Sequence, residues 1–294
     1  MGGMKTTLLL TFAVATGLMA QAPPFQVKVT GHGQPMILIP GLSSSGEVWE
    51  TTVEHYKDRF ECHVLTVAGF AGVPRTAAPM LDRVRDGIAD YIQRKHLDRP
   101  VIVGHSLGGF LALAVAGKYP ALVGRLVIVD AYPFLPAVMD PTATVASAKQ
   151  MAAQMQKRMD SQTQDDYERY VKSGVATRLM VTSDSDFQRI VAWGLASDRT
   201  AVADAMSGMF DVDLRDDLAA IKSPALVLGS WIAYKQYTDH ARTEANLRAQ
   251  YAKLAGVRIE VTDTARHFIM WDDPNWMFGQ MDRFLGEPGS PAAQ

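Results

Sequence analysis

Residues 101–110, VIVGHSLGGF, decide the fold of this chain. The first half is a β-branched, apolar run of the kind that forms a buried strand. The second half places Ser106 between Gly104 and Gly108, in the pattern G-x-S-x-G. Glycines at these positions let a strand and a helix pack closely around a sharp turn that exposes the serine hydroxyl. The pattern predicts a nucleophile elbow, and the alternative is a glycine-rich turn with an incidental serine.

Outward from this stretch, the chain repeats the order strand, then helix. Six short apolar runs have the character of buried strands: 36–39, 62–67, 101–103, 126–129, 225–228 and 258–261. Apolar residues at helical spacing over 79–95, and an almost wholly apolar helix over 106–118, lie between such strands. This alternation predicts an α/β fold with a mostly parallel central sheet flanked by helices.

One segment, residues 136–213, breaks the alternation. It has helical patterns, no convincing strand, and seven of the fifteen methionines. We interpret it as an inserted helical cap between two parts of one α/β core, residues 23–135 and 214–285. Residues 286–294 are predicted to be a disordered tail.

Residues 1–22 have the pattern of a signal peptide. Lys5 precedes an apolar run over 8–19 that is too short to span a bilayer, and Ala20-Gln21-Ala22 is a small-residue cleavage site. Cleavage after Ala22 is the prediction and cleavage after Ala20 is the alternative. We therefore expect an exported protein, periplasmic or extracellular, with no stable membrane insertion after signal cleavage.

Composition excludes several classes of function. The chain has 294 residues and a formal net charge of −2, and no basic stripe that would suit nucleic acid. Cys62 is the only cysteine, so an intramolecular disulfide is impossible. The sequence has no metal-ligand cluster, dinucleotide motif or P-loop lysine, so we expect no cofactor and no metal. It does not indicate an oligomeric state.

A serine hydroxyl is a poor nucleophile at neutral pH and needs a base. His267 follows the last predicted strand by a few residues, in RIEVTDTARHFIMWDDP. The carboxyl ends of parallel strands share one edge of a sheet, so this loop should lie at the edge where Ser106 emerges. His267 is therefore the predicted general base, with a surface histidine as the alternative. Asp272 and Asp273, with Pro274, are interpreted as the cap of the last helix.

Together these features resemble the α/β-hydrolase fold of serine hydrolases. The matching stretches are MILIPGLSSSG, VGHSLGG, RLVIVDAYPF and ARHFIMWDDP, spread over roughly residues 30–285 in the order Ser…Asp…His. The general likeness is to single-domain carboxylesterases with a helical cap, a group described as pimeloyl-carrier methyl ester carboxylesterase-like. The resemblance is specific for the superfamily but not for a substrate.

The resemblance implies roles for particular residues. Ser106 is the nucleophile and His267 the base that takes the serine proton and returns it to the leaving group. The backbone N–H groups of Leu42 and Leu107 form the oxyanion hole. Many relatives have His-Gly where this chain has Pro40-Gly41, a minor change because the donor is a backbone amide.

The triad acid departs from the commonest pattern. Many relatives place an aspartate just after the strand that corresponds to 225–228, but Ile232 occupies that position here. Asp130, which ends the preceding strand, is the favoured acid, and Asp239 is the alternative. Trp231 and Tyr234 lie in the turn that lost its acid, where they line the substrate pocket or else pack under the cap.

The leading functional hypothesis is a serine hydrolase that cleaves a small-to-medium hydrophobic carboxylic ester through an acyl-serine intermediate. The expected partner is therefore a small-molecule ester. The same triad would also serve a lactonase, thioesterase or amidase, because the attacked carbon is alike in each. The alternative from another class is a non-catalytic ligand-binding protein on the same fold.

Overall fold

The computed structural model describes residues 22–286. The predicted signal peptide, residues 1–22, and the predicted tail, residues 286–294, lie almost wholly outside this range, so both stay predictions. Within the described range, no helix is both long enough and apolar enough to cross a membrane.

A seven-stranded sheet forms the centre of the molecule, in the order β1-β3-β2-β4-β5-β6-β7. Six strands are parallel, and β1 runs antiparallel to β3 at one edge. The strands are β1 (Phe25–Gly31), β2 (Gln34–Ile39), β3 (Phe60–Val67), β4 (Val101–His105), β5 (Arg125–Val129), β6 (Ala225–Ser230) and β7 (Arg258–Thr262). The predicted fold class, a mostly parallel α/β sheet, is confirmed.

The edge strand β1 was not anticipated from the sequence. Its residues FQVKVTG do not form a continuous apolar run, and Val29 is half exposed. An edge strand pairs on one side and needs no continuous apolar run, so the pattern that found the other strands is weak here.

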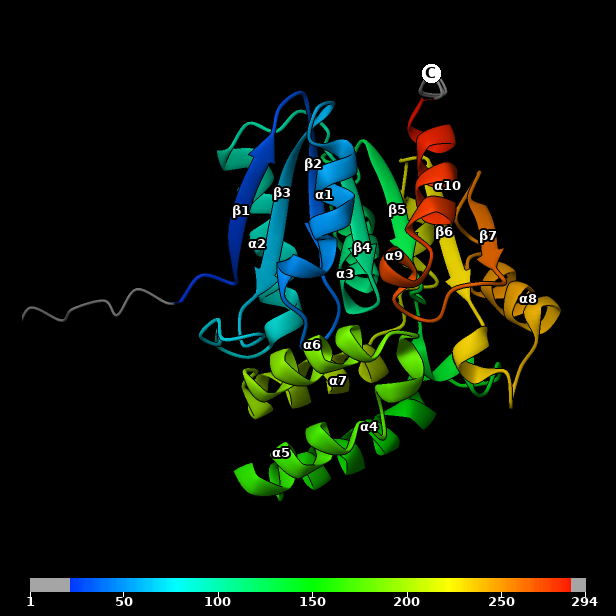
Figure 1. Cartoon of the computed structure of the whole chain (residues 1–294). Helices are drawn as coiled ribbons and strands as arrows, with labels where there is room; N and C mark the ends of the chain where they lie inside the picture. The colour runs from blue at the N-terminus through cyan, green and yellow to red at the C-terminus, as the bar shows by residue number, and fades with distance from the viewer. Residues whose placement is uncertain (1–21, 287–294) are drawn as a thin grey trace, which may run out of the picture.

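Helices cover both faces of the sheet (Figure 1). Successive residues of β2 point to opposite faces: Ile37 and Ile39 join the core under α2 and α3, while Met36 and Leu38 join the core under α1 and α10. The core helices are α1 (Glu50–Tyr56), α2 (Met80–Arg94), α3 (Leu107–Lys118), α8 (His240–Gln250), α9 (Ile269–Asp272) and α10 (Pro274–Gly286).

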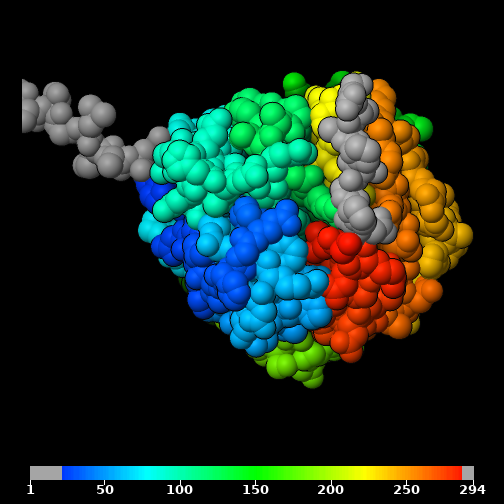
Figure 2. All heavy atoms as spheres, turned by 90° about the horizontal axis from the view of Figure 1, so that it is seen from above, coloured from blue at the N-terminus to red at the C-terminus, as the bar shows by residue number. Residues whose placement is uncertain are grey.

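Helices α1 and α10, far apart in the sequence, lie side by side (Figure 2). Asp282 of α10 accepts hydrogen bonds from His55 of α1, at 3.0 Å, and from Arg59, at 2.7 Å. The ring of His55 also stacks on Phe278, with 4.2 Å between centroids. These contacts fix the C-terminal helix to the first part of the core.

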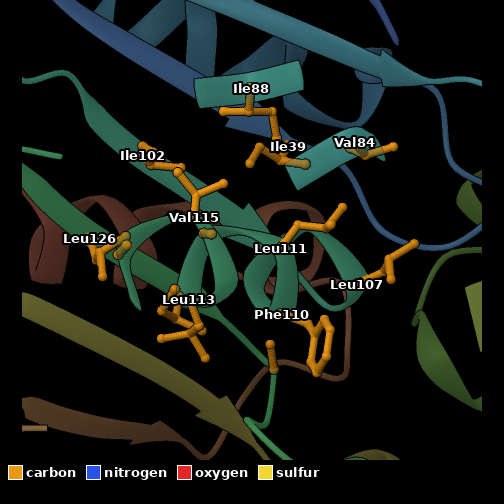
Figure 3. Packing of buried hydrophobic residues seen from close by; sticks show 14 of the residues in the cluster. Ile39, Val84, Ile88, Ile102, Leu107, Phe110, Leu111, Leu113, Val115 and Leu126 are labelled. Atoms are coloured by element: carbon orange, nitrogen blue, oxygen red, sulfur yellow. The ribbon is translucent and has the colours of Figure 1, made fainter. Parts of the chain in front are cut away.

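Helix α3 is apolar nearly all round because it is covered on several sides. Leu111 and Val115 point toward Ile39 and Ile102 of the sheet, and Ile88 of α2 lies beyond them (Figure 3). All five side chains are fully buried. This packing fixes the helix that begins directly after Ser106.

Between β5 and β6 the chain forms helices and no strand within residues 130–224. The long helices are α4 (Val145–Asp160), α5 (Gln164–Ser173), α6 (Asp184–Leu195) and α7 (Arg199–Asp211). They lie together beyond the ends toward which the parallel strands point (Figure 1). Helix α4 packs on α7, and the α6–α7 junction is bonded to the core through Asp198 N–H and the carbonyl of Gly69, at 2.7 Å.

The elbow glycines are required by close backbone contacts. A Cβ on Gly104 would lie 2.2 Å from the carbonyl oxygen of Gly108, and a Cβ on Gly108 would lie 2.2 Å from that of Ile39. Backbone oxygens of a strand and a helix cannot withdraw as a flexible side chain can. These contacts explain why the pattern in this stretch needs glycine on both sides of Ser106.

We therefore expect Gly104→Ala to lower the free energy of unfolding by about 3 kcal/mol, the upper range for overpacking a core. Urea unfolding followed by circular dichroism measures the change. Gly279→Ala on α10 is the matched control, because its Cβ would meet only Arg283 Nη1, at 3.9 Å. Alanine there should be neutral or stabilising by up to about 1 kcal/mol. Equal destabilisation by the two variants would contradict the steric argument.

Candidate active site

Ser106 lies between the end of β4 and the start of α3 in a strained conformation, with φ 54° and ψ −119°. Positive φ is uncommon for any residue other than glycine and persists only when the surroundings impose it. Here the Ser106 N–H donates to the carbonyl of Val129 on β5, at 2.9 Å, and its own carbonyl accepts from Phe110 N–H, at 3.0 Å. The predicted elbow conformation is present.

The loop after β2 passes directly beside Ser106. A Cβ on Gly41 would lie 3.3 Å from Cβ of Ser106 and 3.0 Å from Nδ1 of His105. Leu42 follows in this loop, and Leu107 begins α3. Within residues 22–286 the N–H groups of Leu42 and Leu107 donate to no other group. The role of both N–H groups as oxyanion donors stays a prediction.

Asp130 and His267 form a hydrogen-bonded pair. Asp130 follows β5, and its N–H donates to Leu228 of β6, at 2.7 Å. Its carboxylate is buried, and Oδ2 lies 2.6 Å from Nδ1 of His267. The bond requires a proton on Nδ1, since a carboxylate can only accept. This leaves Nε2 of a neutral His267 as an acceptor.

The other candidate acid lies elsewhere. Asp239 caps α8, where its side chain accepts from Arg242 N–H at 2.8 Å. Ile232, at the position where many relatives have an aspartate, begins a short 3-10 helix, Ile232–Tyr234. Of the two aspartates considered, the structure brings Asp130 to His267.

Ser230, which sequence reasoning missed, holds the carboxylate of Asp130. Its N–H donates to Oδ1, at 2.8 Å, and its hydroxyl donates to Oδ2, at 2.9 Å. Ser230 is the last residue of β6 and is buried. Only the β5–β6 register, which sets Val129 against Leu228, could have revealed this contact.

His105, inside the elbow, supports the backbone of His267. It is fully buried, and its Nε2 donates to the carbonyl oxygen of His267, at 3.1 Å. Burial, and then the nearby His267, lower the pKa of His105 well below its usual value. A neutral His105 therefore fastens the histidine loop to the elbow.

A second set of hydrogen bonds joins the histidine loop to residues 180–182, just before α6. Phe268 N–H donates to the carbonyl of Met180, at 3.2 Å, and Arg266 Nη1 donates to that of Val181, at 2.8 Å. Thr182 N–H donates to Oδ1 of Asp272, at 2.9 Å. The residues on both sides of His267 are thus bound to the helical segment.

Asp272 was interpreted as part of the cap of the last helix, and this is wrong. Its Oδ2 accepts from Arg266 N–H, at 2.9 Å, so it closes the histidine loop. Asp273 is the cap, since its Oδ1 accepts from Trp276 N–H at 3.1 Å. The sequence alone does not show which of two adjacent carboxylates caps a helix, because this depends on their contacts with distant residues.

The two aromatic residues after β6 lie at the same edge of the sheet. Trp231 Nε1 donates to Asp263 Oδ1, at 2.8 Å. Partial burial, and then the charge of Asp130, raise the pKa of the Tyr234 phenol. Tyr234 thus lies near Asp130, while Trp231 is bound to Asp263, which directly follows β7. Their role in lining a pocket stays a prediction.

Three partly buried apolar side chains pack against the large core cluster to which helix α3 belongs. Leu42, Leu135 and Met206 are partly buried and pack against the core cluster that contains Leu107 and Phe110. They come from the loop after β2, the segment after β5 and helix α7. Both the core and the helical segment therefore contribute apolar side chains to this cluster.

Other chemistry has little support among residues 22–286. Burial raises the pKa of the Cys62 thiol to about 11, so the thiolate that would act as a nucleophile is scarce at neutral pH. No group of three or more His, Cys, Asp or Glu side chains in this range is arranged to hold a metal ion. The role of Ser106 as the nucleophile stays a prediction.

Comparison with known proteins identifies the class to which this fold and site correspond. The model of the alpha/beta hydrolase family matches residues 36–279, most of the chain. The chain therefore belongs to the alpha/beta hydrolase family, and this membership supports a hydrolase activity.

The names of the proteins that it resembles refer to different acyl bonds. The chain is 27% identical over 264 residues to N-formylmaleamate deformylase of Pseudomonas putida, covering 88% of this chain and 91% of the relative. It is 26% identical to pimeloyl-[acyl-carrier protein] methyl ester esterase of Vibrio cholerae, covering 68% and 76%. The enol-lactonase of Burkholderia xenovorans has the same fold, with a TM-score of 0.72 and 17% identity over 90% and 96% of the two chains.

Proposed function

We propose that this protein is a serine hydrolase that cleaves a small-to-medium hydrophobic carboxylic ester through an acyl-serine intermediate. The observation that carries the proposal is the buried pair Asp130–His267, with 2.6 Å between Oδ2 and Nδ1, on a loop fastened to the elbow of Ser106. A histidine held in this tautomer, on a loop bonded to the residue before a strained and partly exposed serine, matches the arrangement that activates a hydroxyl.

The reaction follows from this arrangement. Ser106 Oγ attacks the ester carbonyl as His267 Nε2 takes its proton, and the N–H groups of Leu42 and Leu107 bind the resulting oxyanion. His267 then gives the proton to the leaving alcohol, which departs and leaves an acyl-serine. Water attacks the acyl group by the same route, and the carboxylic acid and free Ser106 are released.

Asp130 keeps Nδ1 of His267 as the donor throughout these steps and stabilises the imidazolium that forms. Ser106 forms no hydrogen bond to His267 in the described chain. Catalytic hydrogen bonds often tighten only when substrate binds, so this geometry is compatible with the proposed roles.

The substrate class is proposed from the apolar residues of the loop that follows Gly41, which passes beside Ser106, and of the segments that pack on the same core cluster. The partly buried Leu42, Leu135 and Met206 favour a hydrophobic acyl or alcohol group.

We further propose that residues 136–213 act as a cap over the site, which their position beyond the carboxyl ends of the strands supports (Figure 1). Export, proposed from the pattern of residues 1–22, would place the substrate outside the cytoplasm.

Relatives named for a methyl ester and for a formyl amide keep a second candidate function open. An amide, lactone or thioester would be attacked by the same Ser106 and His267, so the site geometry does not separate these bonds. A non-catalytic binding protein on this fold would not need the Asp130–His267 pair. That pair therefore favours an enzyme.

Turnover of p-nitrophenyl esters from acetyl to decanoyl tests the proposal, with a γ-lactone, an acyl thioester and an N-formyl amide as competing substrates. We expect the highest kcat/KM among short and medium esters, and covalent labelling by a fluorophosphonate. A preference for the formyl amide would move the assignment to a deformylase. Absence of both turnover and labelling would overturn the serine hydrolase proposal and favour the binding protein.

A further inference from the structure

Ser230 places two donors on one carboxylate. Its N–H binds Oδ1 of Asp130 and its hydroxyl binds Oδ2, the oxygen that also accepts from His267. Both residues are almost fully buried, with 5% of Ser230 and 7% of Asp130 exposed. The carboxylate is thereby held at both oxygens from the end of the neighbouring strand.

We propose that Ser230 is a positioning residue for the triad: its hydroxyl orients Asp130 so that Oδ2 faces Nδ1 of His267. This inference rests on the proposed function, because it assigns Ser230 a role in the same reaction. Ser230 does not contact the reacting atoms in this scheme. It acts through Asp130, which acts through His267.

Among the described residues, Ser230 is the one that donates to the Asp130 carboxylate besides His267. Tyr132, Tyr234 and Tyr251 lie near enough to feel the charge of Asp130. Tyr251 nevertheless donates its hydroxyl to the carbonyl of Ala131, at 2.9 Å. Water is scarce around a carboxylate this deeply buried, so a lost donor is not readily replaced.

The hydroxyl and the N–H of Ser230 have separable roles. The N–H restrains Oδ1 whatever side chain is present, because it belongs to the backbone. The hydroxyl restrains Oδ2, and without it only the N–H of Ser230 and His267 itself oppose rotation of the carboxylate about its Cβ–Cγ bond. An imidazole without a well-placed acceptor loses its orientation toward Ser106.

Ser230→Ala should lower kcat by about 10- to 100-fold, the range for a lost hydrogen bond to a charged group, and leave KM nearly unchanged. Ser230→Thr keeps a hydroxyl at this position and should restore most of the activity. Ser223→Ala is the matched control. Ser223 is equally buried, and its hydroxyl donates to the carbonyl of Val123, at 2.8 Å, away from the triad.

Proton NMR of the full chain gives a readout that needs no substrate. The Nδ1 proton of His267 between imidazole and carboxylate should resonate far downfield in the wild type. It should move upfield or broaden by exchange in Ser230→Ala, return in Ser230→Thr, and stay in place in Ser223→Ala. A purely structural role for Ser230 would alter stability without changing this resonance.

An unchanged kcat and an unchanged resonance in Ser230→Ala would overturn the positioning role. So would equal losses of kcat in Ser230→Ala and Ser223→Ala. Failure of the proposed function is distinct: the wild type would then hydrolyse no ester and take up no fluorophosphonate. The resonance would still report whether Ser230 orients Asp130.

Discussion

Replacement of Ser106 by alanine is expected to lower kcat/KM for p-nitrophenyl butyrate by about 10,000-fold or more, the scale of loss when a triad nucleophile is removed. The reason is that in the proposed reaction Ser106 Oγ forms the covalent bond to the acyl group. His267 and the N–H groups of Leu42 and Leu107 would remain, and they supply only the residual rate above water. Steady-state kinetics and intact-mass analysis after fluorophosphonate treatment measure the two consequences.

The fold should survive this change. The strained φ of 54° at position 106 is imposed by the bonds to Val129 and Phe110, which are made by the backbone and remain in Ser106→Ala. Ser207→Ala on α7 is the matched control, and we expect wild-type kinetics and labelling there. Activity of Ser106→Ala within tenfold of the wild type would show that another residue is the nucleophile.

Asp130→Asn should have the second largest effect, a fall in kcat of about 10,000-fold, as expected when a triad acid becomes an amide. Ser230 N–H will still bind the oxygen of the amide, because Oδ1 is its acceptor in the wild type. The NH₂ group then takes the place of Oδ2 and faces Nδ1 of His267. The imidazole must accept there and carry its proton on Nε2, where it can no longer receive the proton of Ser106.

The control for this prediction is Asp239→Asn, at the other candidate acid. Asparagine caps a helix as well as aspartate does, so the bond from Arg242 N–H should persist and stability should change little. We expect kcat within twofold of the wild type. A larger loss in Asp239→Asn than in Asp130→Asn would reverse the assignment of the acid. Parallel kinetics of the two variants decide between them.

The sequence predicts the parallel sheet well because its strands are buried on both faces. Each such strand is a continuous apolar run, and local composition alone reveals it. The edge strand β1 pairs only with β3 and has an exposed side, so it lacks that signal. Its existence depends on pairing with residues some 35 positions later, which no local pattern records.

The residues of the candidate site likewise fall into those that local sequence patterns predict and those that they do not. Ser106 and His267 are found from local patterns, a strand-helix turn and a loop after the last strand. Local patterns leave two candidate aspartates, and only the structure shows that Asp130 is the one bonded to His267. Ser230 and residues 180–182 act across separations of about 90 residues or more, through backbone groups as well as side chains. Such contacts produce no recognisable pattern in the residue spacing or composition of the sequence.

The bonds between residues 180–182 and the histidine loop determine which parts of this molecule can be exchanged by protein engineering. Helices α4 and α5 make no such bonds to the loop, so another pair of helices could replace them, provided that it packs on α6 and α7 as they do. The chain from Met180 to Thr182 is different, because its backbone binds Phe268, Arg266 and Asp272. A chimera should therefore join its foreign segment before Met180 and keep the native sequence from there onward.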